Sequence, residues 1–208
     1  MSHDANSALA VIWSGWTATW PTQLLALIWI VWLISWAIGA FFSARTEKHV
    51  RTWDSRAYRI PILAGAVLLT PWTAGVLGEQ RLWNPGNAIT YVLAAVTLAG
   101  TLFTWWARIH LGRFWSNAIT RKEGHRVIDT GPYGLVRHPI YTGLIAAMLA
   151  TAVAVGTVTA FLGASLIAIG LWQKARMEEG FLTSELGADA YGPYCRRVPM
   201  LIPFLRPR

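Results

Sequence analysis

The sequence predicts an all-α integral membrane protein of about five transmembrane helices, with the last two helices forming a hairpin. Of its 208 residues, 54% are apolar and only 13% are charged, whereas soluble domains carry about 25% charged residues. A soluble chain of this length could not bury so much apolar surface in one core. Because the apolar residues gather in four long blocks, we expect the bilayer to be the solvent of this chain.

The first three apolar blocks are each long enough for one membrane span. They cover residues 22–42, 60–78 and 88–109, and about 20 helical residues cross a ~30 Å hydrocarbon core. The one charged residue inside them is Arg108. It lies near the end of the third block, where we expect its long side chain to snorkel to water.

The fourth block, residues 140–172, predicts a helical hairpin. As one straight helix it would be about 50 Å long, which exceeds what ordinary tilt can absorb. The triplet Val155, Gly156 and Thr157 at its midpoint provides a turn. Two arms of about 16 residues are short for full spans, so we expect either a shallow hairpin or a second helix that continues past Trp172 into the cytosol.

The distribution of Lys and Arg predicts the orientation of these helices. None precedes the first block, five lie between the first two blocks, and one lies in the next loop; six lie between Arg108 and Arg137, and six from Lys174 onward. This alternation matches the positive-inside rule only if the fourth block crosses out and back. We therefore expect the N-terminus outside, the C-terminus in the cytoplasm, and three basic segments on one cytoplasmic face.

Several other classes are disfavoured by the same composition. The net charge of +8 is spread over three juxtamembrane segments, which argues against a nucleic-acid-binding protein. Cys195 is the only cysteine, so neither an internal disulfide nor a two-cysteine metal site is expected. His125 and His138 lack metal-ligand spacing, so we expect no metal. No basic stretch or small-residue cleavage pattern precedes the first block, so we expect no removable signal peptide.

The 13 Trp residues form two patterns. Most lie near block ends or in loops, where the amphipathic ring anchors at the level of the lipid headgroups. Trp29, Trp32 and Trp36 instead share one face of the first predicted span. Such a stripe is typical of helix packing, and a wall for an apolar substrate is the alternative.

Side chains suited to chemistry concentrate in residues 108–141 and 173–199. Both segments lie on the predicted cytoplasmic side, where they could meet over one site. In the first segment, Pro139 directly follows Arg137 and His138. This pattern is typical of a helix start, and the positive end of that helix could receive a carboxylate.

In the second segment, Lys174 and Glu178 are four residues apart and share one helix face, with Glu179 turned about 100° away. A surface ion pair would account for this arrangement. Ionisable groups that directly follow an apolar helix are, however, candidates for function.

Two motifs frame these residues. The string G-H-R-V-I-D-T-G-P-Y-G-L-V-R-H-P-I-Y-T-G runs from Gly124 to Gly143. After the apolar hairpin come the E-E pair, then L-G-x-x-x-Y-x-x-Y-x-x-x-V-P ending at Pro199, then Ile202 and Pro203. In order, spacing and composition, residues 112–204 resemble the isoprenylcysteine carboxyl methyltransferase family and its phospholipid methyltransferase relatives.

This resemblance implies a membrane methyltransferase that binds S-adenosylmethionine at the cytosolic face and takes a lipophilic small molecule or lipid from the bilayer. The residues matching the family's cofactor-binding stretches are His125, Arg126, Val127, Ile128, Tyr133, His138, Pro139, Ile140, Tyr141, Glu178 and Glu179. The implied catalytic residues are Lys174 and Glu178. Lys174 stands where the family's isoprenylcysteine enzymes place a substrate-side Arg, and Lys lacks the planar fork that grips a carboxylate bidentately.

The residues themselves are compatible with methyl transfer. S-adenosylmethionine carries a sulfonium, an ammonium and a carboxylate, so its site needs acidic and basic groups together. Transfer is an in-line displacement that depends on positioning in a dry site. A carboxylate or thiolate acceptor needs no base, whereas a lipid ammonium would require Glu178, His138 or Tyr141 as general base. Methylation of a carboxylate or similar acceptor and N-methylation of a phospholipid both stay open.

Other readings are an NADPH-dependent protein like the membrane sterol reductases, which share the R-H-P-x-Y and E-E pattern in longer chains, and a non-enzymatic scaffold or transporter. The latter would not explain the clustered His, Tyr and Glu residues, and the first three spans lack the broken helices of transporters. We expect two regions: residues 1–110 with three spans, and residues 111–208 with the hairpin and the cofactor site.

Overall fold

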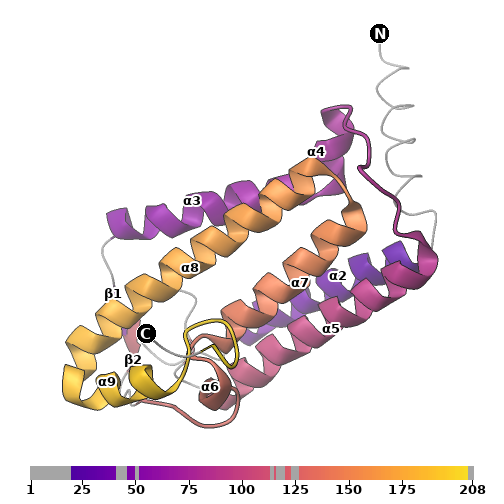
Figure 1. The fold of residues 1–208 in the computed structure, drawn as a ribbon. Helices are drawn as coiled ribbons and strands as arrows, with labels where there is room; N and C mark the ends of the chain where they lie inside the picture. Colours follow the sequence, from indigo (N-terminus) through magenta and orange to yellow (C-terminus); the bar gives the residue numbers. More distant parts are fainter. Residues whose placement is uncertain are drawn as a thin grey trace.

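The computed structural model describes residues 20–40, 46–49, 52–112, 115, 120–122 and 127–205, and this part of the chain is almost entirely helical (Figure 1). The long helices are α2 (Trp20–Ala40), α3 (Thr52–Leu68), α5 (Gly86–Leu111), α7 (Pro139–Val155) and α8 (Val158–Leu186). The short helices are α4 (Pro71–Val76), α6 (Pro132–Leu135) and α9 (Ala188–Arg197). The predicted helical class is confirmed, with one addition: the short strand β1 (Thr46–His49) pairs antiparallel with β2 (Thr120–Lys122).

The predicted hairpin is confirmed at the predicted turn. Gly156 ends α7 in the left-handed conformation, with φ of 70°, which glycine adopts without the steric cost of a Cβ atom. The Thr157 side chain then caps α8 by accepting a hydrogen bond from the backbone N–H of Ala160 at 3.2 Å. Of the two expected forms of the hairpin, the structure shows the one with a longer second helix. Helix α8 continues past Trp172, as far as Leu186.

Three of the described helices, α2, α5 and α8, are long and apolar enough to cross a membrane. The helix α7 is apolar but has only 17 residues, and α3, also of 17 residues, carries the exposed Arg56 and Arg59 in its first half. The span count of five and the orientation of the termini therefore stay predictions. Large apolar side chains cover the outside of α2: Leu24, Leu27, Ile30, Val31, Leu33, Ile34 and Ile38.

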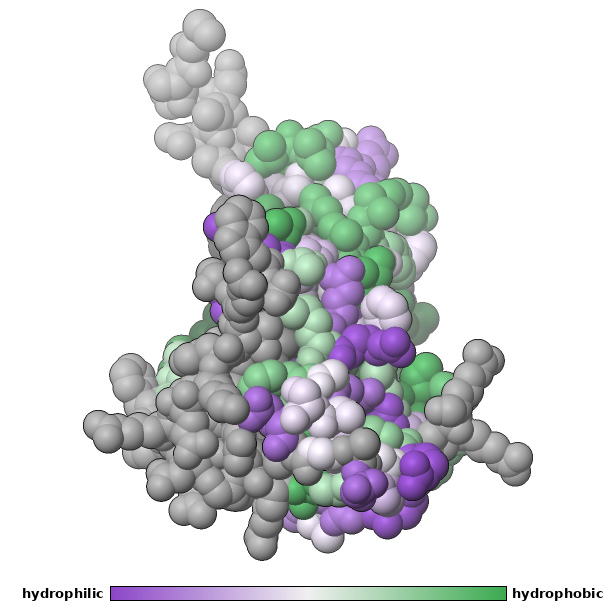
Figure 2. Space-filling model, turned by 90° about the vertical axis from the view of Figure 1, so that its left-hand side faces the viewer, coloured by the Kyte–Doolittle hydropathy of each residue, from purple (hydrophilic) through white to green (hydrophobic). Residues whose placement is uncertain are grey.

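The surface also divides along the long axis of the molecule. On the face shown in Figure 2, hydrophobic residues gather over the upper part and hydrophilic residues toward the lower part. In Figure 1 the turn between α7 and α8 lies at the same end as α4, and α6 and α9 lie at the opposite end. The apolar end suits the bilayer and the polar end suits water.

Glycines let the helices of the two halves approach closely. A Cβ atom on Gly100 of α5 would lie 2.6 Å from the carbonyl oxygen of Gly143 in α7. In the same way, a Cβ atom on Gly65 of α3 would lie 2.5 Å from the carbonyl oxygen of Gly163 in α8. Small residues at such crossings are typical of membrane helix pairs. Each helix of the hairpin thus packs against one helix of the predicted N-terminal region.

The Trp stripe of α2 lies in the seam with α5 and α7. The indole Nε1 of Trp29 donates to Thr151 Oγ1 at 3.0 Å, and Nε1 of Trp32 donates to Thr104 Oγ1 at 2.8 Å. These bonds satisfy polar groups that would otherwise face hydrocarbon. They support the packing interpretation of the stripe over the substrate wall.

The prediction that Arg108 snorkels to water is wrong. Arg108 is only 5% exposed. Its guanidinium carbon lies 3.5 Å from the ring centroid of Trp115 and 4.3 Å from that of Trp36. The end of α2 covers it, because a Cβ atom on Gly39 would lie 2.9 Å from the guanidinium. Aromatic faces attract a desolvated cation, so this arginine is buried within the protein. We call Arg108 with Trp36, Trp105 and Trp115 the Arg108 cage.

Candidate functional site

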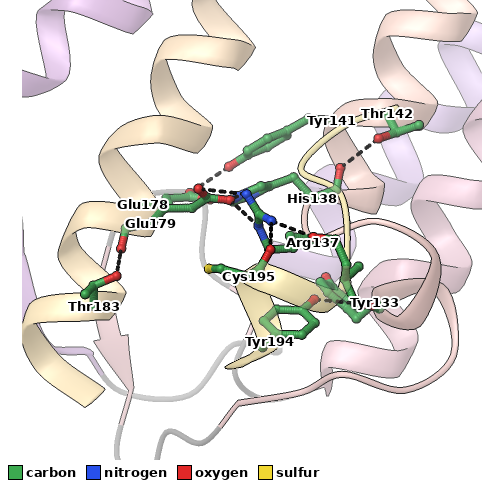
Figure 3. Close-up of polar contacts among 11 residues, drawn as sticks. Tyr133, Arg137, His138, Tyr141, Thr142, Glu178, Glu179, Thr183, Tyr194 and Cys195 are labelled. Carbon is green, nitrogen blue, oxygen red and sulfur yellow. Dashed lines mark hydrogen bonds and ion pairs between the residues drawn. The ribbon is translucent and has the colours of Figure 1, made fainter. Parts of the chain in front are cut away.

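The site is assembled where the chain after α9 crosses the start of α7. The backbone N–H of Arg137 donates to the carbonyl oxygen of Pro199 at 2.8 Å, and that of His138 donates to Met200 at 3.1 Å. One turn later, Thr142 Oγ1 donates to the carbonyl oxygen of Leu201 at 2.6 Å. These bonds fix the entry into α7 against a segment about sixty residues away, and the side chains of Arg137, His138 and Tyr141 face α8 (Figure 3).

Arg137 is the most fully bonded side chain at this junction. Its Nε and Nη2 donate to the two carboxylate oxygens of Glu179, at 2.6 and 3.1 Å. Its Nη1 donates to the carbonyl oxygens of Cys195, at 2.8 Å, and Val198, at 2.5 Å. Burial alone would lower the pKa of Arg137, but the hydrogen bonds and charge of Glu179 raise it above its ordinary value. The guanidinium therefore joins α7, α8 and α9 as a permanent cation.

His138 lies between two carboxylates. Its Nε2 is 3.2 Å from Oε1 of Glu179, and its Nδ1 is 3.4 Å from Oε2 of Glu178. Burial by itself would lower the pKa of His138, but the hydrogen bonds to Glu178 and Glu179 outweigh it and raise the pKa above its ordinary value. Only the protonated ring has a donor on both nitrogens, so the geometry favours an imidazolium.

The predicted pair on α8 is present and faces inward. Lys174 Nζ lies 4.0 Å from Oε1 of Glu178, and the hydroxyl of Tyr141 donates to the same oxygen at 2.6 Å. The ring of Tyr141 stacks on that of His138, with centroids 5.4 Å apart. Glu179 is also within the cluster, because its side chain reaches the other nitrogen of His138. Both carboxylates therefore belong to one network, although they are about 100° apart around the helix.

The structure places the other predicted residues around this network. Tyr133 is buried in α6, where its carbonyl oxygen accepts from the hydroxyl of Tyr194 at 2.8 Å. Burial, followed by the charge of Glu178, raises the pKa of Tyr133. Val127 packs against Tyr194 and its neighbours.

Three further predicted residues lie away from the charged network, and two lie outside the described residues. Ile128 is half-buried outside the charged cluster. Pro139 starts α7, and Ile140 packs into the core between α7 and α8. His125 and Arg126 lie outside the described residues.

Two residues of the cluster were missed by the sequence analysis. Arg137 lies beside His138 in the motif quoted above, so the sequence did point to it. Its hydrogen bonds to four acceptor oxygens are visible only in the structure. Tyr58 of α3 had no such signal, since it lies in the N-terminal half. It is 4% exposed, and the centroid of its ring is 5.6 Å from Lys174 Nζ, close to the 5.2 Å that separates Nζ from the ring of Tyr141.

The cluster thus combines two carboxylates, an imidazolium, a guanidinium and an ammonium at the end of an apolar helix hairpin. Such a mixed set can bind a zwitterionic ligand, because both signs of charge find a partner. Within the described part of the chain, no group of three or more His, Cys, Asp or Glu side chains is arranged to hold a metal ion.

Comparison with known proteins gives the same family as the motifs. Residues 92–184 match the model of the isoprenylcysteine carboxyl methyltransferase family, a range that runs from α5 to the end of α8. A protein-S-isoprenylcysteine O-methyltransferase of Schizosaccharomyces pombe is 26% identical over 188 residues, which cover 79% of this chain and 77% of the relative. Protein-S-isoprenylcysteine O-methyltransferase B of Arabidopsis thaliana is 27% identical over 133 residues, covering 61% of this chain and 63% of the relative.

Proposed function

Since residues 92–184 match the model of the isoprenylcysteine carboxyl methyltransferase family, we propose that this chain is an integral membrane methyltransferase that transfers a methyl group from S-adenosylmethionine to the carboxylate of a lipophilic acceptor. The observation that carries the proposal is the charged network of Arg137, His138, Glu178 and Glu179 at the end of the hairpin. The names of the two relatives support the same reaction.

The donor set fits S-adenosylmethionine, which supplies an electrophilic methyl group on a positively charged sulfur. In this proposal the carboxylate of Glu178 receives the ammonium or faces the sulfonium, since a carboxylate offers about four acceptor positions and Tyr141 occupies one of them. Glu179 is committed to Arg137 and His138, so its role is to hold that ring in place. The start of α7 is the positive end of that helix, which suits the cofactor's carboxylate.

The protonation state of His138 favours an acceptor that is already anionic. An imidazolium held between two carboxylates cannot take a proton, and the hydroxyl of Tyr141 donates to Glu178 rather than accepting. An ammonium acceptor would need a general base, which these groups do not readily provide. A carboxylate acceptor needs only positioning next to the methyl group, which a rigid buried network provides.

The remaining elements of the proposal concern placement in the membrane. We assign the hairpin and the preceding helices to five spans, with the N-terminus outside and the C-terminal region in the cytoplasm. Residues 1–110 then hold three of these spans, and residues 111–208 hold the hairpin and the cofactor site. The substrate is a lipophilic small molecule or lipid that enters from the bilayer.

The test is calorimetric titration of the detergent-purified protein with S-adenosylhomocysteine, the demethylated product, with NADPH as the parallel ligand. We expect micromolar binding of S-adenosylhomocysteine and no heat from NADPH. Binding of NADPH alone would favour a reductase, and binding of neither would favour a non-enzymatic membrane protein.

The variant Glu178→Ala tests the site within the same experiment. It removes a charge-assisted contact and no core packing, so cofactor binding is expected to be lost while the protein still inserts in the membrane. Asp189→Ala, which removes an exposed carboxylate from the first turn of α9, is the matched control and should bind as the wild type does. Unchanged affinity in Glu178→Ala would refute the assignment of the cofactor site.

A further inference from the structure

The ring of Tyr58 lies close to two cations. The ammonium of Lys174 is 5.6 Å from its centroid, and the guanidinium carbon of Arg59 is 5.9 Å from it. Both distances are within the ~6 Å over which an aromatic face attracts a cation. Arg59 is exposed, whereas Lys174 is only 8% exposed. A positive charge therefore stands at the surface and another in the interior, and both are close to the same aromatic ring.

The interior cation is held by aromatic rings as well as by a carboxylate. Lys174 Nζ also lies 5.2 Å from the ring of Tyr141, and its distance of 4.0 Å to Glu178 is longer than a hydrogen bond. Taking an ammonium out of water is costly unless it is compensated. The two rings contribute to that compensation without neutralising the ammonium. The positive charge of Lys174 therefore acts on groups bound in the site.

The position of Tyr58 is fixed by helix packing. A Cβ atom on Gly170 of α8 would lie 2.8 Å from the carbonyl oxygen of Tyr58, so the two backbones touch one turn away from Lys174. Tyr58 therefore reaches the site from α3, a helix that precedes the matched residues 92–184. A residue outside that range thus shapes the surroundings of the predicted catalytic lysine.

We propose that Tyr58 is a positioning residue that, with Arg59 and Lys174, selects an anionic acceptor: the exposed Arg59 attracts the acceptor's carboxylate, and the ring of Tyr58 holds Lys174 where it receives that carboxylate beside Glu178. The positive charges of Arg59 and Lys174 repel an ammonium headgroup by the same Coulomb law. This inference rests on the proposed function and assigns Tyr58 and Arg59 to the recognition of its carboxylate acceptor.

Variants of Tyr58 test the inference in steady-state methylation assays. Two acceptors are compared: a farnesylated N-acetylcysteine, which presents a carboxylate, and phosphatidylethanolamine, which presents an ammonium. Tyr58→Leu removes the ring and is expected to raise KM for the carboxylate acceptor about tenfold with a smaller change in kcat. Tyr58→Phe keeps the ring and should restore the wild-type KM. Tyr91→Leu, which removes an exposed ring from α5, is the matched control and should leave KM unchanged.

Arg59 gives a test that does not depend on a buried residue. Arg59→Gln is expected to raise KM for the carboxylate acceptor about threefold and to weaken its dependence on salt, since exposed charges are screened. Arg59→Glu should raise KM further. Because this side chain is exposed, these variants carry the test even if Tyr58→Leu does not fold.

The outcomes separate the inference from the proposed function. If the wild type fails to bind S-adenosylhomocysteine, the proposed function is wrong. If it binds and methylates the carboxylate acceptor while KM is unchanged in Tyr58→Leu and in both Arg59 variants, only the inference is overturned. A wild type that prefers phosphatidylethanolamine would overturn both the inference and the carboxylate acceptor of the proposed function. Unchanged affinity for S-adenosylhomocysteine in all the variants is expected, because Tyr58 and Arg59 are assigned to the acceptor.

Discussion

Arg108 and Arg137 are two buried arginines held in opposite ways. Arg137 gives all its described contacts to oxygen, through both carboxylate oxygens of Glu179 and two backbone carbonyls. Within the described part of the chain, the side chain of Arg108 makes one hydrogen bond, from Nη1 to the carbonyl oxygen of Trp36 at 3.2 Å. Its Nη2 is buried with no acceptor among the described residues. Aromatic rings of the Arg108 cage surround it instead.

The difference teaches what each cation does for the fold. A guanidinium with matched acceptors fixes orientation, because its planar fork allows few geometries. A guanidinium among ring faces is held less directionally, because the attraction depends on the ring quadrupole. Arg137 therefore aligns the three elements of the proposed site, and Arg108 fills the contact between the ends of α2 and α5.

The largest effect is expected at Arg137. Arg137→Met leaves Glu179 as a buried, partly unpaired charge, which costs about 3–5 kcal/mol of unfolding free energy. Arg137→Lys restores the charge but not the fork, so it should recover only part of that loss. Thermal unfolding in detergent and titration with S-adenosylhomocysteine would measure the loss of stability and of cofactor binding together.

The control for this prediction is Arg176→Met on the same helix as Glu179. Arg176 is exposed, with its guanidinium 6.0 Å from the ring of Trp172, so the change should cost less than about 0.5 kcal/mol. Equal losses in Arg137→Met and Arg176→Met would mean that the hydrogen bonds of Arg137 do not organise the site.

A smaller effect is expected from the protonation of His138. Because its pKa is raised in the folded protein by Glu178 and Glu179, the protonated ring stabilises the fold fully below its ordinary pKa of about 6.5. That contribution is lost as pH rises through the higher folded-state value. The unfolding temperature of the wild type should therefore fall as pH increases above about 6.5.

The variant His138→Asn isolates this pH dependence. Asn is a good residue for the position before a helix, so the start of α7 should form, but nothing titrates there. The decline in unfolding temperature above neutral pH should then be weaker than in the wild type. His110→Asn, at an exposed position of α5, is the control that should keep the full decline. If His138→Asn also keeps it, His138 is not the titrating group.

The sequence was a good guide wherever the determinant is local. The hairpin turn at Gly156, the start of α7 at Pro139, and the Lys174 and Glu178 pair all follow from a backbone preference or a helical spacing that a short stretch of residues defines. The side chains of Glu178 and Glu179 nonetheless meet in one network. The predicted angle of about 100° between them is bridged by the two nitrogens of His138, which only the packed structure brings between them.

The sequence was a poor guide where the determinant is a contact between distant helices. Tyr58 approaches Lys174 only because α3 and α8 touch at glycines such as Gly65 and Gly163. Arg108 is buried only because the end of α2 covers it at Gly39. Neither contact is visible as a pattern in the sequence of one helix. An argument from hydropathy therefore predicts that the Arg108 side chain reaches water.

The smallest effect is expected from Arg108→Met, which tests the other side of the comparison. The change removes the cation–π attraction, worth about 2 kcal/mol when desolvated, and one hydrogen bond. It also removes a buried N–H that has no acceptor among the described residues, and leaving such a group unpaired costs about 1–3 kcal/mol. These terms nearly cancel, so the unfolding free energy should change by less than about 1 kcal/mol, and binding of S-adenosylhomocysteine should be unaffected. A loss as large as that of Arg137→Met would show that Arg108 orders the protein as Arg137 does, and the distinction between the two arginines would fail.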